Sequence, residues 1–283
     1  MNTPILLCVY RRLDKVVAVL DSLKLIKPTH LYISANAPKN DAEKEYTDAI
    51  KKAIDKQITW ECTVYKKYED HHINSCSESI VKGIDWFFSQ VEYGIILEDD
   101  CIAHPSFFEF SSILLEKHKN DESVYQISGT NINFDHDNPP KLLSTNFSFP
   151  NWGWATWRRC WAKYSHEMNN WEAIKDIINN KTNDKEFWEE FLTFNAKTKT
   201  AWDIQWNIDI WTNGGNILIP SFNTVSNIGF GYLATHTSND ENLGANLPTK
   251  NFIINNASFG HADDNQIEKK IIHLIKNISS PKK

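Results

Sequence analysis

The chain has 283 residues, with 30 Lys and Arg against 36 Asp and Glu, so its formal net charge at pH 7 is −6. This charge argues against a nucleic-acid partner, because phosphate contacts require a basic face. The hydrophobic fraction of 41% is ordinary for a folded globular protein, and no apolar run approaches the roughly 20 residues of a membrane span.

The N-terminal half alternates short apolar runs with segments of helical periodicity. This pattern is typical of a mainly parallel sheet covered by helices. Strands are predicted at 5–9, 31–34 and 59–65, and helices at about 13–25 and around 46–54. The opening unit is therefore βαβαβ.

A second helix–strand unit follows. Ser75 stands three residues before Glu78, a capping-box pattern that predicts a helix start. A buried strand at 94–97 ends in Glu98-Asp99-Asp100, a new helix is expected from Pro105, and a further strand at 124–128.

The chain changes character from about residue 131. Nine of the 11 Trp lie between Trp152 and Trp211. Helices are predicted at 184–196 and 202–211, a strand at 217–219, and a C-terminal helix from Asn265 that ends in a frayed tail. The halves are not expected to be independent domains.

The cysteines and the N-terminus bear on location. Five cysteines without a close Cys-x-x-Cys pair suggest neither a disulfide framework nor a zinc ribbon. The first residues run directly into a strand and lack the basic region and long apolar core of a signal peptide. We therefore expect a cytoplasmic protein without a transmembrane segment, with peripheral membrane contact left open.

The acidic triplet is the strongest chemical signal. Adjacent carboxylates repel one another unless solvent, cationic side chains or a metal ion relieves the repulsion. The strand delivers them to a carboxyl edge, where open α/β sheets bind ligands. Alternation along a strand would place Glu98 and Asp100 on one face and Asp99 on the other. A hard divalent cation, Mn²⁺ or Mg²⁺, suits such ligands, and the alternative is a solvated acidic turn before a helix.

Four stretches together resemble a known enzyme class: 4–12 (PILLCVYRR), 95–100 (IILEDD) followed by 105–108 (PSFF), 202–206 (WDIQW), and 227–230 (NIGF) with 235–237 (THT). They are similar to GT-A fold nucleotide-diphospho-sugar glycosyltransferases, specifically the inverting N-acetylglucosaminyltransferase I type and related bacterial transferases. The resemblance implies an α/β GT-A fold with a mainly parallel central sheet flanked by helices. It implies one GT-A domain over 1–283, with a nucleotide-sugar-binding half at 1–130, a Trp-rich acceptor-binding half at 131–264, and the C-terminal helix and tail at 265–283.

The resemblance also implies roles for single residues. The triplet takes the place of the DxD motif, with Asp100 as metal ligand and Glu98 and Asp99 on the nucleotide sugar. Glu98 departs from the first Asp of that motif. Asp203 is the expected catalytic base that deprotonates the acceptor hydroxyl, and its alternative role is a first-turn Asp favoured by the helix dipole. Asp209 and Glu190 are backups without a motif.

Other donor contacts follow from the same resemblance. We expect Val9, Tyr10, Arg11 and Arg12 at the UDP, and the sequence does not decide which arginine points inward. Asn36 stands where the family has a base-reading acid, so we expect it at the uracil. His236 is expected to contact the metal. For His71 and His72 a surface position is favoured, with a place in the lining of the donor pocket as the alternative.

Trp faces stack on sugar rings. Most of the tryptophans are expected in the core, and Trp152, Trp154 and Trp202 are the candidates for acceptor binding.

The sequence therefore predicts a metal-dependent, inverting glycosyltransferase of the hexosyltransferase class. It would move a sugar, with GlcNAc the best guess, from a UDP-sugar to a hydroxyl of a glycan or glycolipid acceptor in bacterial surface-glycan synthesis. A sugar-nucleotide pyrophosphorylase is the first alternative, although 9–12 lack the Gly-rich phosphate loop of such enzymes. A non-catalytic glycan-binding protein is the second, and a retaining mechanism stays open.

Overall fold

The computed structural model describes residues 1–165, 171–198, 201–230 and 244–278, except the side chains of 171–173 and 278. In the N-terminal half, strands and helices alternate. The elements are β1 (Ile5–Val9), α1 (Leu13–Ile26), β2 (His30–Ala35), α2 (Asp41–Gln57), β3 (Thr63–Tyr68), α3 (Cys76–Gln90) and β4 (Tyr93–Glu98).

The second half mixes short strands with helices. The elements are β5 (Cys101–Ala103), α4 (Pro105–Lys117), β6 (Val124–Ser128), β7 (Lys141–Thr145), β8 (Trp154–Trp157), α5 (Arg158–Trp161), α6 (Trp171–Lys181), α7 (Lys185–Thr198), α8 (Trp202–Thr212), β9 (Asn216–Pro220), β10 (Val225–Asn227), the 3₁₀ turn η1 (Ile254–Asn256), β11 (Ser258–His261) and α9 (Asp264–Ile278).

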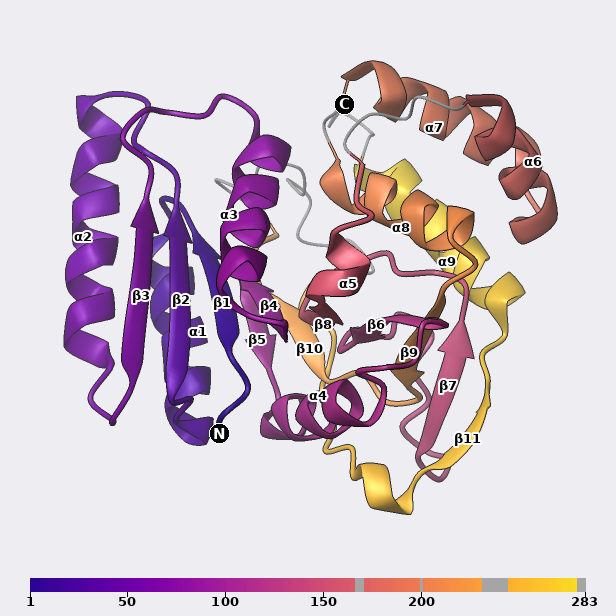
Figure 1. The fold of residues 1–283 in the computed structure, drawn as a ribbon, viewed down its shortest axis with the longest axis horizontal. Coiled ribbons are helices and arrows are strands. Elements are labelled where there is room, and N and C mark those ends of the chain that lie inside the picture. Colours follow the sequence, from indigo (N-terminus) through magenta and orange to yellow (C-terminus); the bar gives the residue numbers. More distant parts are fainter. Residues whose placement is uncertain (166–170, 199–200, 231–243, 279–283) are drawn as a thin grey trace.

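One nine-stranded sheet runs through both halves in the order β11-β7-β9-β6-β8-β4-β1-β2-β3 (Figure 1). Strands β1 to β4 are parallel to one another, β8 is antiparallel to both β4 and β6, and β9 is parallel to β6. A separate pair joins β5 and β10. The predicted class, an α/β protein with a mainly parallel central sheet flanked by helices, is confirmed.

Helices cover the sheet in two groups. Helix α1 contacts α2 and α4, whereas α3 contacts α5 and α8. Helices α6 to α9 gather above the β6, β7 and β9 strands in Figure 1. Among the residues that the structure describes, no helix has the length and apolar character needed to cross a bilayer.

Buried side chains form two clusters that α8 joins. The larger cluster surrounds the central strands and includes Trp154 and Trp206, which are 1% and 0% exposed. The smaller lies among α6 to α9 and includes Ile208 and Ile271. Because α8 places Trp206 in one cluster and Ile208 in the other, this helix fixes the Trp-rich segment against the sheet.

Several predicted elements are confirmed and others need correction. The strands at 5–9 and 124–128 have the expected bounds, and Ser75 caps α3 by accepting a hydrogen bond from the Glu78 backbone N–H at 3.2 Å. The third strand lies further along than 59–65, at Thr63–Tyr68, because Trp60 is held outside the strand by donating its indole N–H to the Pro28 carbonyl at 2.9 Å. The antiparallel strand β8 and the strands β7 and β11 were not predicted.

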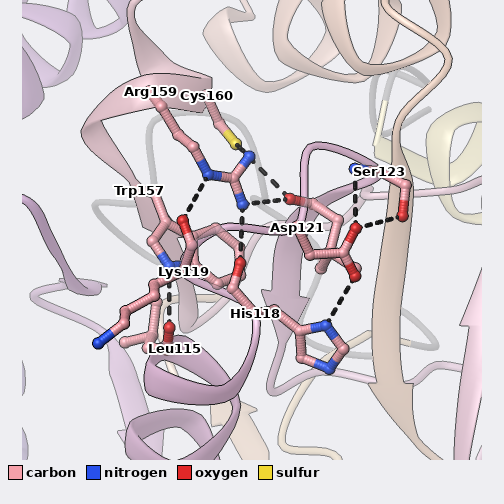
Figure 2. A network of polar contacts seen from close by, with 9 residues as sticks. Leu115, His118, Lys119, Asp121, Ser123, Trp157, Arg159 and Cys160 are labelled. Carbon is pink, nitrogen blue, oxygen red and sulfur yellow. Dashed lines mark hydrogen bonds and ion pairs between the residues drawn. The ribbon is translucent and has the colours of Figure 1, made fainter.

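A polar network fixes the turn between α4 and β6 against β8 and α5 (Figure 2). The Arg159 guanidinium donates to the carbonyls of His118, Lys119 and Val124 at 3.0 to 3.1 Å. Asp121 accepts from Ser123, and this hydrogen bond and the one with His118 hold the pKa of Asp121 at about 2. These contacts fix the start of β6 beside β8 and α5.

A buried carboxylate attaches α9 to the start of α7. Glu268 is 1% exposed and accepts hydrogen bonds from the backbone N–H groups of Asn183 at 2.8 Å and Asp184 at 3.0 Å, and from the Trp188 indole N–H at 3.0 Å. We expect Glu268→Gln to lower the free energy of unfolding by about 2–4 kcal/mol, because the side-chain NH₂ group of Gln would face N–H donors whose hydrogen bonds the carboxylate accepts.

Thermal unfolding measures this loss. The control is Glu190→Gln, an exposed change on α7 that we expect to alter stability by less than about 0.5 kcal/mol. Equal effects of the two changes would show that the Glu268 hydrogen bonds do not stabilise the fold.

Candidate functional site

A pocket of about 270 Å³ opens at the carboxyl ends of β1, β2 and β4. Strand β1 has β2 on one side and β4 on the other, so the chain order reverses there, and open α/β sheets bind ligands at such points. All seven residues predicted to contact the nucleotide sugar line this pocket: Val9, Tyr10, Arg11, Arg12, Asn36, Glu98 and Asp99.

Arg12 lies against the acidic triplet. One terminal nitrogen of its guanidinium, Nη2, contacts Asp99 Oδ1 and lies 2.8 Å from Asp100 Oδ2. The other, Nη1, donates to the Gly229 carbonyl at 3.4 Å. The predicted alternation of Asp99 and Asp100 is wrong, because β4 ends at Glu98 and the chain then turns, bringing both aspartates to one guanidinium.

Asp100 is also held from its other side. Its Oδ1 accepts from the Asn227 amide at 3.3 Å and from the Cys101 thiol at 3.5 Å. Gly229 packs so closely that an added Cβ would lie 1.9 Å from Asp100 Oδ2. The sequence signal Asn-Ile-Gly therefore supplies a small residue and an amide that together orient this carboxylate.

The triplet is short of positive charge. Burial, together with the charges of Asp100, Asp203 and Asp99, raises the pKa of Glu98 well above its ordinary value. Burial also raises the pKa of Asp99 to about 6, although the Arg12 charge and hydrogen bonds oppose this. One guanidinium therefore does not fully compensate these carboxylates.

The donor set fits a divalent cation that shares its coordination with a substrate. Asp99 and Asp100 direct oxygens at one point, which the Arg12 nitrogen occupies. Within the described part of the chain, no group of three or more His, Cys, Asp and Glu could hold a metal by itself. Mg²⁺ commonly binds through one or two carboxylates plus substrate phosphates, so this pair suffices chemically. His236 lies outside the described residues.

A second charged group, Glu43 with Tyr10 and Arg11, forms the outer wall of the pocket. Glu43 on α2 accepts a hydrogen bond from the Tyr10 hydroxyl at 2.5 Å and pairs with Arg11 at 3.0 Å. The His72 ring lies 6.0 Å from the Tyr10 ring, centroid to centroid, and lines the pocket. For His72 the alternative, a place in the pocket lining, is therefore correct, and the favoured surface position is wrong. Of the two arginines, Arg12 faces the acidic triplet and Arg11 faces Glu43.

Asn36 holds the neighbouring loop. Its side-chain amide donates to the Ile73 carbonyl at 2.8 Å and accepts from the Ile73 N–H at 2.9 Å. Each polar atom of the amide thus already has one backbone partner. The expected uracil contact of Asn36 stays a prediction, but its visible role is to position 71–74 beside the pocket.

Asp203 lies in the first turn of α8 and is close enough to Glu98 to raise the pKa of that carboxyl. Burial raises the pKa of Asp203 itself to about 6, against the hydrogen bonds from its own and the Ile204 backbone N–H groups. The N-cap of α8 is Ala201, so Asp203 is not the capping residue. The carboxylate is therefore a stronger base than an ordinary Asp, and it lies near Glu98 of the acidic triplet.

The three candidate acceptor tryptophans separate in the structure. Trp154 and Trp202 are 1% and 5% exposed and stack on each other with centroids 5.6 Å apart. Their assignment to acceptor binding is corrected, because ring faces covered by other rings cannot stack on a sugar. Trp152 is half-buried, contacts Phe230 edge-on at 5.5 Å, and keeps its predicted role as a proposal.

Sequence reasoning missed several lining residues. These are Cys8, Ser34, Lys39, Glu43, Ile73, Asn74, Cys76, Ser79 and Ile80. Ser34 follows from its place near the end of β2, and Cys76 from the first turn of α3. Glu43 has no such signal, because it reads as an ordinary acidic residue in the first turn of a helix.

The buried carboxylates on α8 predict how stability depends on pH. Burial raises the pKa of Asp203 to about 6 and that of Asp209 to about 7, the latter against one hydrogen bond from the Ser165 N–H. The folded state therefore binds these protons more tightly than the unfolded state, so stability is expected to fall as pH rises from about 4 to 8, by about 1–3 kcal/mol.

Thermal unfolding across that range tests this expectation. Asp209→Asn should flatten the upper part of the profile, because the neutral amide removes the higher of the two transitions. A profile that rises from pH 4 to 8 in the wild-type protein would contradict the assignment.

Comparisons with known proteins add little. No protein-family model matches the sequence, and a search of curated proteins finds no match. Among solved structures, the 4-diphosphocytidyl-2C-methyl-D-erythritol synthase of Anaerococcus prevotii is 12% identical with a TM-score of 0.38, over 68% of this chain and 84% of that one. The inositol-1-phosphate CTP transferase of T. maritima is 11% identical with a TM-score of 0.34, over 57% and 73%. At this level neither likeness indicates an activity for this chain.

Proposed function

We propose that the chain is a metal-dependent, inverting glycosyltransferase of GT-A type. It transfers a sugar, with GlcNAc the best guess, from a UDP-sugar to a hydroxyl of a glycan or glycolipid acceptor, in bacterial surface-glycan synthesis in the cytoplasm. The observation that carries the proposal is the convergence of the seven expected donor-binding residues on one pocket, Glu98 and Asp99 of the acidic triplet among them, with Asp203 close enough to Glu98 to raise its pKa.

The pocket has the chemistry that a nucleoside diphosphate needs. Tyr10 and His72 offer ring surfaces at the outer wall, where Arg11 pairs with Glu43, and Arg12 brings cationic N–H donors to the acidic triplet. A guanidinium binds phosphate oxygens through two parallel hydrogen bonds. The nucleoside is therefore assigned to the outer wall and the diphosphate to the inner end at Asp99.

Asp100, with Asp99 beside it, is the residue assigned to the divalent cation. When bound, such a cation stabilises the negative charge that develops on the departing diphosphate. The protein holds Asp100 in place through Asn227 and through the close packing of Gly229.

Asp203 is assigned to take the proton from the acceptor hydroxyl. Its raised pKa, about 6, leaves it mainly ionised near neutral pH yet a better proton acceptor than an ordinary carboxylate. Trp152 is proposed to contact the acceptor sugar.

Incubation with UDP-sugars tests the proposal. We expect Mn²⁺-dependent release of UDP, slow without acceptor and fastest with UDP-GlcNAc, and a product of inverted anomeric configuration by NMR. Formation of UTP from a UDP-sugar and pyrophosphate would instead indicate a pyrophosphorylase. Glycan binding without turnover of any UDP-sugar would indicate a binding protein.

A further inference from the structure

We propose that the Arg12 guanidinium occupies the cation's place in the unloaded protein. It would leave Asp100 when the cation arrives and then pair with the diphosphate. This inference rests on the proposed function, and it adds a rule for how that site is loaded: cation and nucleotide bind cooperatively because one arginine is exchanged between them.

The contacts of Asp100 identify the oxygen at issue. Oδ1 is already held by the Asn227 amide and the Cys101 thiol. Oδ2 lies 2.8 Å from Arg12 Nη2, and the same nitrogen contacts Asp99. A cation that binds this pair of carboxylates must therefore take the point where the guanidinium nitrogen now lies.

Because the site is buried, binding of the cation without the nucleotide, or of the nucleotide without the cation, is unfavourable. Asp99 and Asp100 are 4% and 7% exposed, and the Arg12 side chain is 18% exposed. A cation that binds without nucleotide displaces a half-buried guanidinium that then has no anion. A nucleotide that binds without cation meets an arginine already paired and carboxylates that repel its phosphates.

When both ligands bind, each charged group in the site has a partner of opposite charge. The carboxylate pair exchanges one positive charge for two, and the guanidinium exchanges carboxylate oxygens for phosphate oxygens of the same geometry. Arg12 lines the donor pocket, so the exchange needs a side-chain rotation and no chain movement. Coupling of this kind is reciprocal, so each ligand must raise the affinity of the other.

Mn²⁺ titration without nucleotide, followed by the EPR signal of the free ion, tests the exchange. Arg12→Gln is expected to bind Mn²⁺ at least about tenfold more tightly than wild type, since a competing charge in contact with a carboxylate has effects of this size. Arg11→Gln is the matched control: it removes the same charge from the same pocket, but Arg11 pairs with Glu43, so its Mn²⁺ affinity should stay within about twofold.

The outcomes separate this inference from the function on which it rests. Unchanged or weaker Mn²⁺ binding by folded Arg12→Gln, or an equal gain in Arg11→Gln, would overturn the exchange and leave the cation site standing. Absence of Mn²⁺ binding in wild type and Arg12→Gln, even with UDP present, would overturn the cation assignment itself. Even at saturating Mn²⁺, Arg12→Gln should bind UDP more weakly than wild type does, because the guanidinium that pairs with the diphosphate is missing.

A second variant, Arg12→Lys, tests the exchange if Arg12→Gln does not fold. Arg12→Lys keeps a positive charge, but its one nitrogen can replace only Nη2, which contacts Asp99 and Asp100, and not Nη1, which donates to the Gly229 carbonyl and helps to anchor the side chain. Its Mn²⁺ affinity should exceed that of wild type by about threefold or more. An affinity equal to wild type in this variant would also overturn the exchange.

Discussion

Asp203→Asn is expected to reduce sugar transfer by about a hundredfold or more, with UDP and Mn²⁺ affinities almost unchanged. The amide keeps the size of the side chain but cannot accept the acceptor's proton. In the wild-type protein, the transfer rate should rise with pH and level off above about pH 6, because the raised pKa of Asp203 sets where the base is ionised.

The same variant should be more stable than wild type at pH 8. Burial disfavours the ionised carboxylate, and the amide removes that cost. For the transfer assay, Asp209→Asn is the matched control, because Asp209 lies on the same helix and its pKa is also raised by burial. Full transfer activity in Asp203→Asn, or loss of transfer in Asp209→Asn but not in Asp203→Asn, would show that another residue is the base.

Asp100→Ala is expected to weaken Mn²⁺-dependent UDP binding by about a hundredfold or more, since this carboxylate would hold, in a poorly solvated site, the cation that neutralises the diphosphate. Calorimetry with Mn²⁺, and then with EDTA, measures this loss. Metal-free UDP binding should change much less.

Removal of Asp100 also disturbs its neighbours, so a second variant is needed. Asp100→Asn keeps an oxygen for the Asn227 and Cys101 donors but loses the charge. We expect it to lose cation-dependent binding as Asp100→Ala does, while its unfolding temperature stays closer to wild type. Unchanged Mn²⁺-dependent UDP affinity in either folded variant would remove the metal assignment.

Local patterns sufficed for much of the N-terminal half. Apolar runs at 5–9 and 94–97 and the Ser75 cap place β1, β4 and α3 to within a residue or so. Because parallel strands end at one edge, the residues that follow β1 and β4 had to approach one another. The pocket that unites Arg12, Glu98 and Asp99 follows from that rule.

Tertiary packing decided what local patterns could not. The partner of each arginine depends on Glu43, which comes from a helix face with no distinguishing pattern. Strand β8 contains Trp154 and Trp157, whose rings suit a sugar site as well as a core, and only its position between β4 and β6 shows that they are buried. The turn after Glu98 likewise depends on how β5 pairs with β10.

Calorimetric titration of the wild-type protein with UDP, in Mn²⁺ and then in EDTA, is the decisive test for a nucleotide-sugar site, with GDP and CMP as controls. We expect UDP binding that depends on Mn²⁺ and exceeds the binding of both controls. Absence of nucleotide binding in Mn²⁺ would contradict the assignment of this pocket to a nucleotide sugar.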